Sequence, residues 1–195
     1  MPNSFQSLCV FCGAHSGTNP RFAEVARDLG RYLAENKIRL VTGGGSVGLM
    51  GAVADGCLEA GGEVVGVITT YLRERELAHP KATVMEVTPN MLERKKRMAE
   101  LSEGFISLPG GIGTLDELFE MLTWSRLSEH DKPSGLLNVD GFYDELISFC
   151  TVTQVEAGFI TEEDAGNLVA ADSIDDLIEK LSEAARLGPS SLYRK

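Results

Sequence analysis

Short apolar runs alternate with longer segments of helical periodicity along the chain, and this alternation limits the possible folds more than any other feature. We predict strands at 7–11, 38–41, 63–68, 83–87, 105–108, 133–139 and 168–171. We predict helices at 20–36, 90–101, 115–127, 143–157 and 173–185, one more that ends at residue 60, and a short one near 72–77. The strands are apolar throughout, which is typical of parallel strands buried on both faces. The sequence therefore predicts an α/β fold, a doubly wound parallel sheet with helices on both faces.

The length and charge of the chain restrict its organisation and its partners. Its 195 residues suit a single domain over 1–195, with a loose tail from about 187. The formal net charge of −11 argues against binding to nucleic acid or to an anionic membrane. No apolar run approaches membrane-spanning length, and the first residues lack the basic-then-apolar pattern of a signal peptide. We therefore expect a cytoplasmic protein.

The four cysteines have the pattern of buried thiols. Cys9, Cys57 and Cys150 lie inside apolar segments, where cysteine acts as a small hydrophobic residue. Cys9 and Cys12 form one C-x-x-C pair, but Cys9 lies within a predicted strand, so the two side chains are expected to point to opposite faces. We therefore predict neither a metal site nor a redox pair here.

Three loops rich in Gly, Ser or Thr follow predicted strands, at 12–17, 42–48 and 109–114. In a parallel sheet every strand-to-helix loop lies at the same edge, and ligands bind there. The three loops are thus predicted to form one cleft lined by backbone N–H donors, which suits a phosphate. Gly44 and Gly45 in the second loop are among the predicted substrate contacts.

The stretch at 109–117, P-G-G-I-G-T-L-D-E, is the most informative of these loops. Its glycines allow close approach of a ligand, and the following helix directs the positive end of its dipole at the loop. Thr114 is placed to cap that helix, with Glu117 three residues later. Glu117 has two interpretations: it completes a capping box, or it acts on a sugar beside the bound phosphate. Its helical sector, shared with Met121 and Trp124 at the edge of the apolar face, favours the second.

A second glycine pattern, Gly43-x-Gly45-x-x-Gly48, matches the dinucleotide-binding fingerprint in its letters only. That fingerprint usually belongs to the first strand and pairs with an acid at the end of the next one. The next predicted strand here ends at Ile68-Thr69-Thr70, without an acid. We therefore do not predict NAD binding, and the chain also lacks a Gly-Lys-Ser/Thr phosphate loop.

A basic run at 93–97, E-R-K-K-R, lies in the predicted helix at 90–101. A solvated helix face is the simpler interpretation. On the helical wheel, however, Arg94 and Lys95 fall on the two borders of the apolar face, while the other charged residues project outward. Arg94 and Lys95 are therefore predicted to lean into the cleft and to supply positive charge there.

Together these residues resemble the LONELY GUY (LOG) family, which releases cytokinin bases from riboside 5′-monophosphates and whose members are often described as lysine decarboxylase-like. The resemblance rests on Glu93-Arg94-Lys95 and on P-G-G-x-G-T-x-x-E at 109–117. Supporting matches lie at 12–13, 43–51, 123–124 and 132–138. The resemblance implies a Rossmann-like fold, a homodimer or larger homo-oligomer with its sites near the interface, and no metal or organic cofactor.

The resemblance also implies roles for particular residues. Arg94 and Glu117 are expected to be the catalytic pair. The expected phosphate loop is Gly110, Gly111, Ile112, Gly113 and Thr114, and the further expected substrate contacts are Glu76, Lys95 and Thr123. The sequence departs from the family pattern at His15, Thr69, Leu92, Arg126 and Ser128.

The expected reaction is hydrolysis of the N-glycosidic bond of an adenosine 5′-monophosphate, with the base either plain adenine or N6-prenylated. Breaking this bond builds positive charge on the sugar, which an ionised Glu117 would stabilise while Arg94 holds phosphate or ribose oxygens. Two rival functions remain. A non-catalytic binding or sensing module would hold the nucleotide without hydrolysing it. A pyridoxal phosphate-dependent decarboxylase would need a Schiff-base lysine, and no lysine lies at an apolar strand end suited to that role.

Overall fold

The computed structural model describes residues 5–75 and 78–188, and in them strands and helices alternate as the sequence predicts. The strands are β1 (Ser7–Phe11), β2 (Arg39–Thr42), β3 (Val64–Thr69), β4 (Val84–Thr88), β5 (Phe105–Ser107), β6 (Ser134–Leu137) and β7 (Leu168–Ala171). The longer helices are α1 (Pro20–Glu35), α2 (Gly48–Glu59), α4 (Met91–Glu100), α5 (Ile112–Arg126) and α9 (Ile174–Leu187). The shorter helical segments are α3 (Thr70–Arg75), η1 (Val139–Gly141), α6 (Asp144–Ser148), η2 (Phe149–Thr153), α7 (Gln154–Glu156) and α8 (Glu162–Ala165).

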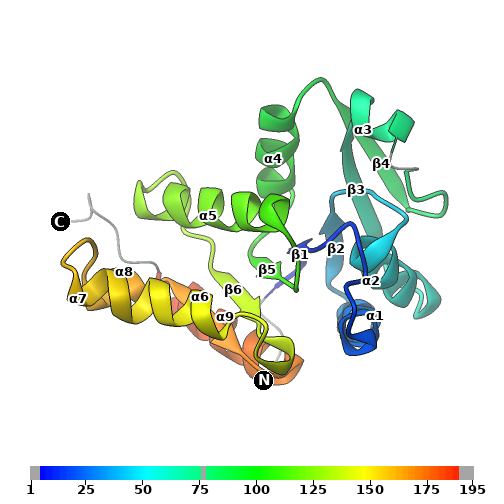
Figure 1. The fold of residues 1–195 in the computed structure, drawn as a ribbon. Coiled ribbons are helices and arrows are strands. Elements are labelled where there is room, and N and C mark those ends of the chain that lie inside the picture. The colour runs from blue at the N-terminus through cyan, green and yellow to red at the C-terminus, as the bar shows by residue number, and fades with distance from the viewer. Residues whose placement is uncertain (1–4, 76–77, 189–195) are drawn as a thin grey trace.

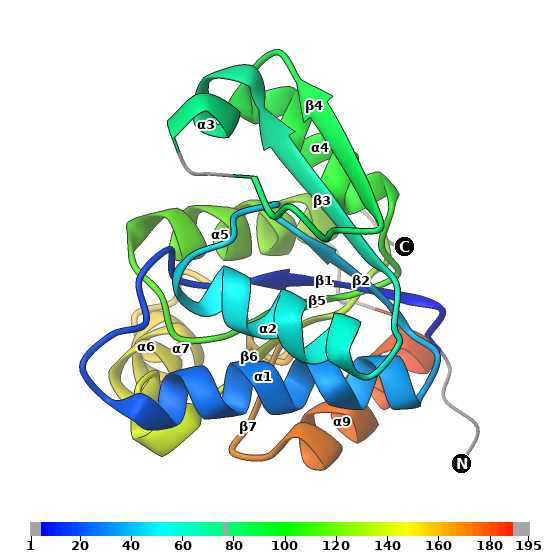
Figure 2. The same cartoon turned by 90° about the vertical axis from the view of Figure 1, so that its right-hand side faces the viewer.

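The strands form one parallel sheet in the order β4-β3-β2-β1-β5-β6-β7 (Figures 1 and 2). The chain winds outward from β1 to β4 and then crosses to the other side of β1, where β5 begins the second half of the sheet. β1 and β5 therefore flank the topological switch point, where doubly wound sheets leave a crevice for ligands. The predicted doubly wound α/β fold is confirmed.

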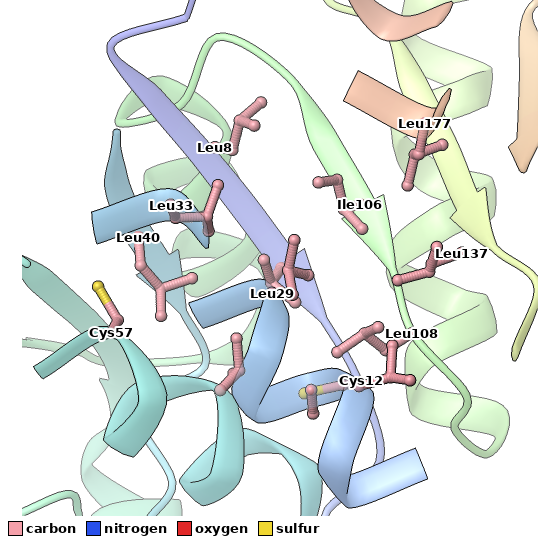
Figure 3. Packing of buried hydrophobic residues seen from close by; sticks show 14 of the residues in the cluster. Leu8, Cys12, Leu29, Leu33, Leu40, Cys57, Ile106, Leu108, Leu137 and Leu177 are labelled. Atoms are coloured by element: carbon pink, nitrogen blue, oxygen red, sulfur yellow. The ribbon is translucent and has the colours of Figure 1, made fainter. Parts of the chain in front are cut away.

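Helices cover both faces of this sheet (Figures 1 and 2). On one face α1, α2 and α9 pack against the strands, and Leu29, Leu40 and Leu177 belong to the core between them (Figure 3). On the other face α4 and α5 pack against the strands through Met98 and Met121. The inner strands are therefore buried from both sides, which explains why their sequences are mostly apolar.

Two helices near the switch point, α1 and α4, have asparagine side chains as N-caps. The Asn19 side chain accepts a hydrogen bond from the backbone N–H of Arg21, and Pro20 opens α1. The Asn90 side chain accepts from the backbone N–H of Glu93 and so caps α4. The predicted starts of both helices are confirmed.

Most boundaries differ from the prediction by one or two residues, and the larger differences have local reasons. α5 begins at Ile112, three residues earlier than predicted, because Gly111 adopts the extended conformation of an N-cap residue. The predicted helix at 143–157 is interrupted by the π-helical turn η2, and α8 follows it without having been predicted. β6 is shorter than predicted because the chain turns into η1, where Asp140 has a φ of 51°.

Two expectations from composition can be compared with the structure. The four cysteines are all free and buried. Cys9 packs in the core under α4 and α5, and Cys12 in the core under α1 and α2, so their predicted opposite orientation is confirmed. Within residues 5–75 and 78–188, the helices are too short or too polar to cross a membrane.

Glycines let α1 and α2 pack backbone against backbone. A Cβ at Gly30 would lie 2.1 Å from the carbonyl oxygen of Val53, and one at Gly56 would lie 2.1 Å from that of Arg27. Alanine at position 30 gains about 1 kcal/mol of helix propensity, whereas overpacking this contact costs about 1–3 kcal/mol or more. We therefore expect Gly30→Ala to lower the free energy of unfolding in urea by about 1 kcal/mol or more.

The control for this prediction is Glu24→Ala, on the exposed side of α1. It should change the free energy of unfolding by less than about 0.5 kcal/mol. A Gly30→Ala variant at least as stable as the wild type would show that the two helices separate at no cost, against the packing described here.

Candidate functional site

The loops at the carboxyl ends of β1, β2 and β5 meet at the switch point. The backbone N–H of Gly13 donates to the carbonyl of Pro109 (3.1 Å), and that of Leu49 donates to the carbonyl of Gly13 (3.0 Å). Gly48 has a φ of 61°, and a Cβ there would lie 2.3 Å from the carbonyl carbon of Ala14. The predicted convergence of the three glycine-rich loops is therefore confirmed, and glycine at position 48 permits the close approach.

A cavity of about 610 Å³ opens beside these loops, a volume typical of small-molecule sites. Its apolar wall is formed by Phe22, Leu49, Met50, Leu72, Met91 and Phe142. Its polar and charged side chains include His15, Arg94, Thr114, Asp116 and Glu117. Among the described residues, Arg94 is the only Lys or Arg that lines it. An anionic ligand would therefore depend mainly on backbone N–H groups.

The N-terminus of α5 supplies such groups. Gly111 is the N-cap residue and has no side chain to accept from the first N–H groups of the helix, and these groups form the positive end of the helix dipole. Gly110, Gly111, Gly113 and Thr114 all line the cavity. Ile112 does not line it, and its side chain is exposed, so only its backbone can take part.

Thr114 does not cap α5, contrary to the prediction, so the capping-box alternative for Glu117 is excluded. Because α5 starts at Ile112, Thr114 lies inside its first turn, where it is buried. A Cβ at Gly110 would lie 2.1 Å from the Oγ1 atom of Thr114, so the loop folds closely over this hydroxyl. Glu117 is one turn further along the helix than a capping residue and has a different partner.

That partner is Arg94. Its Nη1 atom lies 3.0 Å from Oε1 of Glu117, and the two side chains are 6% and 11% exposed. Arg94 comes from α4 and Glu117 from α5, and both line the cavity. The structure thus brings together the two residues that were expected to form a catalytic pair.

Backbone carbonyls hold the rest of the Arg94 guanidinium. Its Nε donates to the carbonyl of Val67 (2.9 Å), and its Nη2 donates to that of Gly43 (3.4 Å). A Cβ at Gly43 would lie 2.1 Å from Nη2, so a side chain at this position would displace the guanidinium. Arg94 is therefore fixed over the carboxyl ends of β2 and β3 and directed at Glu117.

Burial has the largest effect on the ionisation of Glu117. It raises the pKa of the carboxyl above 4.5, the ordinary value for Glu, whereas the charge and the hydrogen bond of Arg94 lower this pKa. The negative charge of Asp116 raises it slightly further. The net pKa is raised, so Arg94 is the main group that favours the ionised carboxylate.

Lys95 does not line the cavity, contrary to the prediction from the helical wheel. Its Nζ lies 3.0 Å from Oδ2 of Asp116 and 2.8 Å from Oε2 of Glu120, and these two carboxylates of α5 hold it. The helical wheel identified the right face of α4 but not the acidic partners that α5 presents to it. Lys95 thus joins α4 to α5 beside the Arg94–Glu117 pair.

The remaining predicted contacts are not brought to this cavity. Thr123 is exposed on α5 and does not line it. Gly44 and Gly45 do not line it either, because their loop turns toward the segment after α3, where the carbonyl of Gly44 accepts from the N–H of His79 (2.9 Å). Glu76 lies outside the described residues.

The sequence analysis missed the apolar wall of the cavity. Phe142 follows β6, and its ring contacts that of Phe22 edge to face, with centroids 5.5 Å apart. Met91 reaches the cavity from the first turn of α4. The rule that selected the glycine-rich loops also applies to the loop after β6, so Phe142 could have been found by its position at the same edge.

The fold and the site define a doubly wound α/β protein with a cavity at its switch point and a buried Arg–Glu pair in the cavity wall. Residues 50–181 match the family model described as "Possible lysine decarboxylase". The chain is 44% identical over 183 residues to cytokinin riboside 5′-monophosphate phosphoribohydrolase LOG3 of Arabidopsis thaliana, covering 94% of this chain and 85% of that protein. It is 43% identical over 179 residues to the LOG protein of the same description from Oryza sativa subsp. japonica, covering 92% and 74%. The chain belongs to the LOG family.

Solved structures share the fold at lower sequence identity. The molybdenum cofactor carrier protein of Chlamydomonas reinhardtii has a TM-score of 0.70 at 23% identity, covering 92% of this chain and 98% of that one. The molybdenum cofactor binding protein of Rippkaea orientalis has a TM-score of 0.69 at 23% identity, covering 91% and 95%. These likenesses concern the fold alone, which therefore does not distinguish one ligand from another.

Proposed function

We propose that this protein hydrolyses the N-glycosidic bond of an adenosine 5′-monophosphate, plain or N6-modified. The bond between C1′ and the base nitrogen breaks, and its electron pair leaves with the base. Water supplies a hydroxyl group to C1′ and a proton to the base, so the products are the free base and ribose 5-phosphate. The observation that carries this proposal is a buried, paired carboxylate about one and a half turns along a helix whose N-terminus has no side-chain cap and lines the same cavity.

The start of α5 is the proposed binding site of the 5′-phosphate, called the phosphate seat below. Gly110, Gly111, Gly113 and Thr114 line the cavity there, and the helix dipole and free N–H groups favour an anion. The protein carries a net charge of −11 and places no lysine in the cavity wall within its described part. A site made of backbone N–H groups favours a single phosphate group over a nucleic acid, because the many phosphates of a nucleic acid would need a basic surface.

Glu117 is the proposed catalytic carboxylate. It lies five residues after Ile112, the first residue of α5, which is about 7.5 Å along the helix axis. This separation is comparable with the length of a ribose 5-phosphate, so a phosphate held at the helix start places C1′ near the carboxylate. An ionised Glu117 would stabilise the positive charge that develops on the sugar and orient the attacking water.

Arg94 is the proposed partner that keeps Glu117 ionised and oriented. Its Nε and Nη2 atoms already bind carbonyls of β3 and of the loop after β2, and its Nη1 binds Glu117. This geometry favours a role exerted through Glu117 over the direct grip on phosphate or ribose oxygens that the sequence suggested. Arg94 and Glu117 would therefore act as one unit.

We further propose a cytoplasmic homodimer or larger homo-oligomer. Free, buried cysteines are typical of proteins in reducing compartments. Apolar side chains are exposed on α5, at Ile112 and Phe119, and on η2, at Phe149 and Val152. A surface of this kind supports an interface with a second copy. Thr123 lies on the same helix, so the proposed interface offers a place for the substrate contact expected of it.

The test is to incubate the protein with AMP and with N6-isopentenyl-AMP and to measure free base and ribose 5-phosphate by chromatography. We expect equimolar products, with the faster substrate defining the base preference. Adenosine, which lacks the phosphate, is the control and should react far more slowly. Tight binding of both monophosphates without release of base would instead identify a non-catalytic binding module.

A further inference from the structure

The loop after β6 makes a hydrogen bond to Leu108, the residue just before the loop that is proposed to bind the phosphate. Tyr143 is almost fully buried, and its hydroxyl donates a hydrogen bond of 2.6 Å to the carbonyl of Leu108. Leu108 directly precedes Pro109 at the end of β5. Tyr143 and Leu108 are 35 residues apart in the chain, so this contact connects two separate strand-to-helix loops.

Leu108 is held from both sides by this arrangement. Its N–H donates to the carbonyl of Phe11 in β1 (2.9 Å), and its own carbonyl accepts from Tyr143. The next carbonyl, that of Pro109, accepts from the N–H of Gly13. These are the last fixed backbone groups before Gly110 and Gly111, so they set the direction in which the glycines enter the cavity.

Tyr143 is itself fixed. Its backbone N–H donates to the side-chain oxygen of Asn138 (2.8 Å). The Asn138 amide group donates to Asp144 (2.7 Å) and to Asp172 (3.2 Å), so it ties the end of β6 to the end of β7. Burial raises the pKa of the Tyr143 phenol, and the nearby Cys12 raises it further, so the phenol keeps its proton and remains a donor.

The same loop also reaches the other side of the seat. Phe142 lines the cavity and packs against Phe22 of α1. The Asn19 amide, at the start of α1, donates to the carboxylate of Asp140 (2.8 Å). The loop after β6 is therefore anchored at both ends, and a hydroxyl held by it can act as a rigid support.

We propose that Tyr143 is a positioning residue that fixes the loop at 109–114 for the substrate phosphate. This inference rests on the proposed function only for the identity of the anion. Tyr143 does not line the cavity and so would act through Leu108, without touching the substrate. Loss of its hydroxyl would leave the buried carbonyl of Leu108 without this donor and would loosen the peptide that leads into the seat.

The test is Tyr143→Phe, which keeps the ring and removes the hydroxyl. Loss of one buried hydrogen bond should raise KM for AMP by about fivefold to tenfold while kcat changes by less than about twofold. Inhibition by ribose 5-phosphate should weaken by the same factor, whereas inhibition by adenine, which has no phosphate, should not change. Equal weakening of both inhibitors, or of neither, would overturn the assignment.

The matched control is Thr151→Val. Thr151 also donates its hydroxyl hydrogen to a backbone carbonyl, that of Ile147 (2.8 Å), but it does not line the cavity. Its substitution should leave both inhibition constants unchanged, and thermal unfolding confirms that both variants are folded at the assay temperature. Binding of ribose 5-phosphate, measured by calorimetry, tests Tyr143 even in a protein that releases no base, so the two proposals can fail separately.

Discussion

Replacing Glu117 with Gln is expected to lower kcat by about a hundredfold or more, with a much smaller change in KM. The amide has nearly the same shape as the carboxylate but carries no charge to stabilise the developing positive sugar. Phosphate binding at the start of α5 should persist, because the N–H groups there do not involve Glu117. The measurement is steady-state release of base from AMP, with binding of AMP determined separately by calorimetry.

Glu120→Gln provides the matched control for this result. Glu120 lies about one turn further along α5 and also pairs with a cation of α4, Lys95, but it does not line the cavity. Its substitution should change kcat by less than about threefold, because Glu120 lies outside the cavity and Asp116 remains as a partner of Lys95. Near-normal turnover in Glu117→Gln would remove the carboxylate from the mechanism and leave the Arg94–Glu117 pair a structural role.

Replacing Arg94 with Gln is expected to move the acid limb of the activity profile to higher pH as well as to slow the reaction. The active form of Glu117 is the carboxylate, so activity is lost as the pH falls through its pKa. Burial raises that pKa above 4.5, and Arg94 opposes the effect. Removing the guanidinium should therefore raise the pKa further, and we expect the acid limb to move up by about one pH unit or more.

The measurement is kcat/KM for AMP across the pH range in which the protein stays folded. Arg97→Gln is the control, because Arg97 lies on the same helix but pairs with Glu86 and Glu100 and does not line the cavity. Its profile should coincide with that of the wild type. A loss of activity in Arg94→Gln by the same factor at every pH would mean that Arg94 does not act through the ionisation of Glu117.

The fold was predictable because its signals are local and repeated. The short apolar runs at 7–11 and 168–171 match β1 and β7 at both ends, although β1 is fully buried and β7 only partly. The switch point could be located in part, because glycine-rich loops follow β1 and β5. The pairing of Arg94 with Glu117 was expected from the family resemblance, and the structure adds the contact itself.

Other features of the site depend on contacts between distant segments. Nothing in the local sequence tells that Lys95 meets Asp116 and Glu120, since a helical wheel describes one helix and not its neighbour. The start of α5 was misplaced because Thr114 has the chemistry of a cap, whereas Gly111 fits that position by its conformation. Tyr143 is an ordinary aromatic residue in the sequence and gains its importance only from the carbonyl of Leu108.

The switch point has a consequence for the order in which the protein becomes functional. The cavity is lined by residues of the loop after β1, of α4 and α5, and by Phe142, so an N-terminal part of the chain that ends before Phe142 lacks one of its walls. During synthesis, the first half of the sheet would emerge well before the anion-binding cavity is complete. If a nucleotide binds this cavity as proposed, it should stabilise the fold only once the chain through Phe142 has been made, and it should slow unfolding without guiding the early steps of folding.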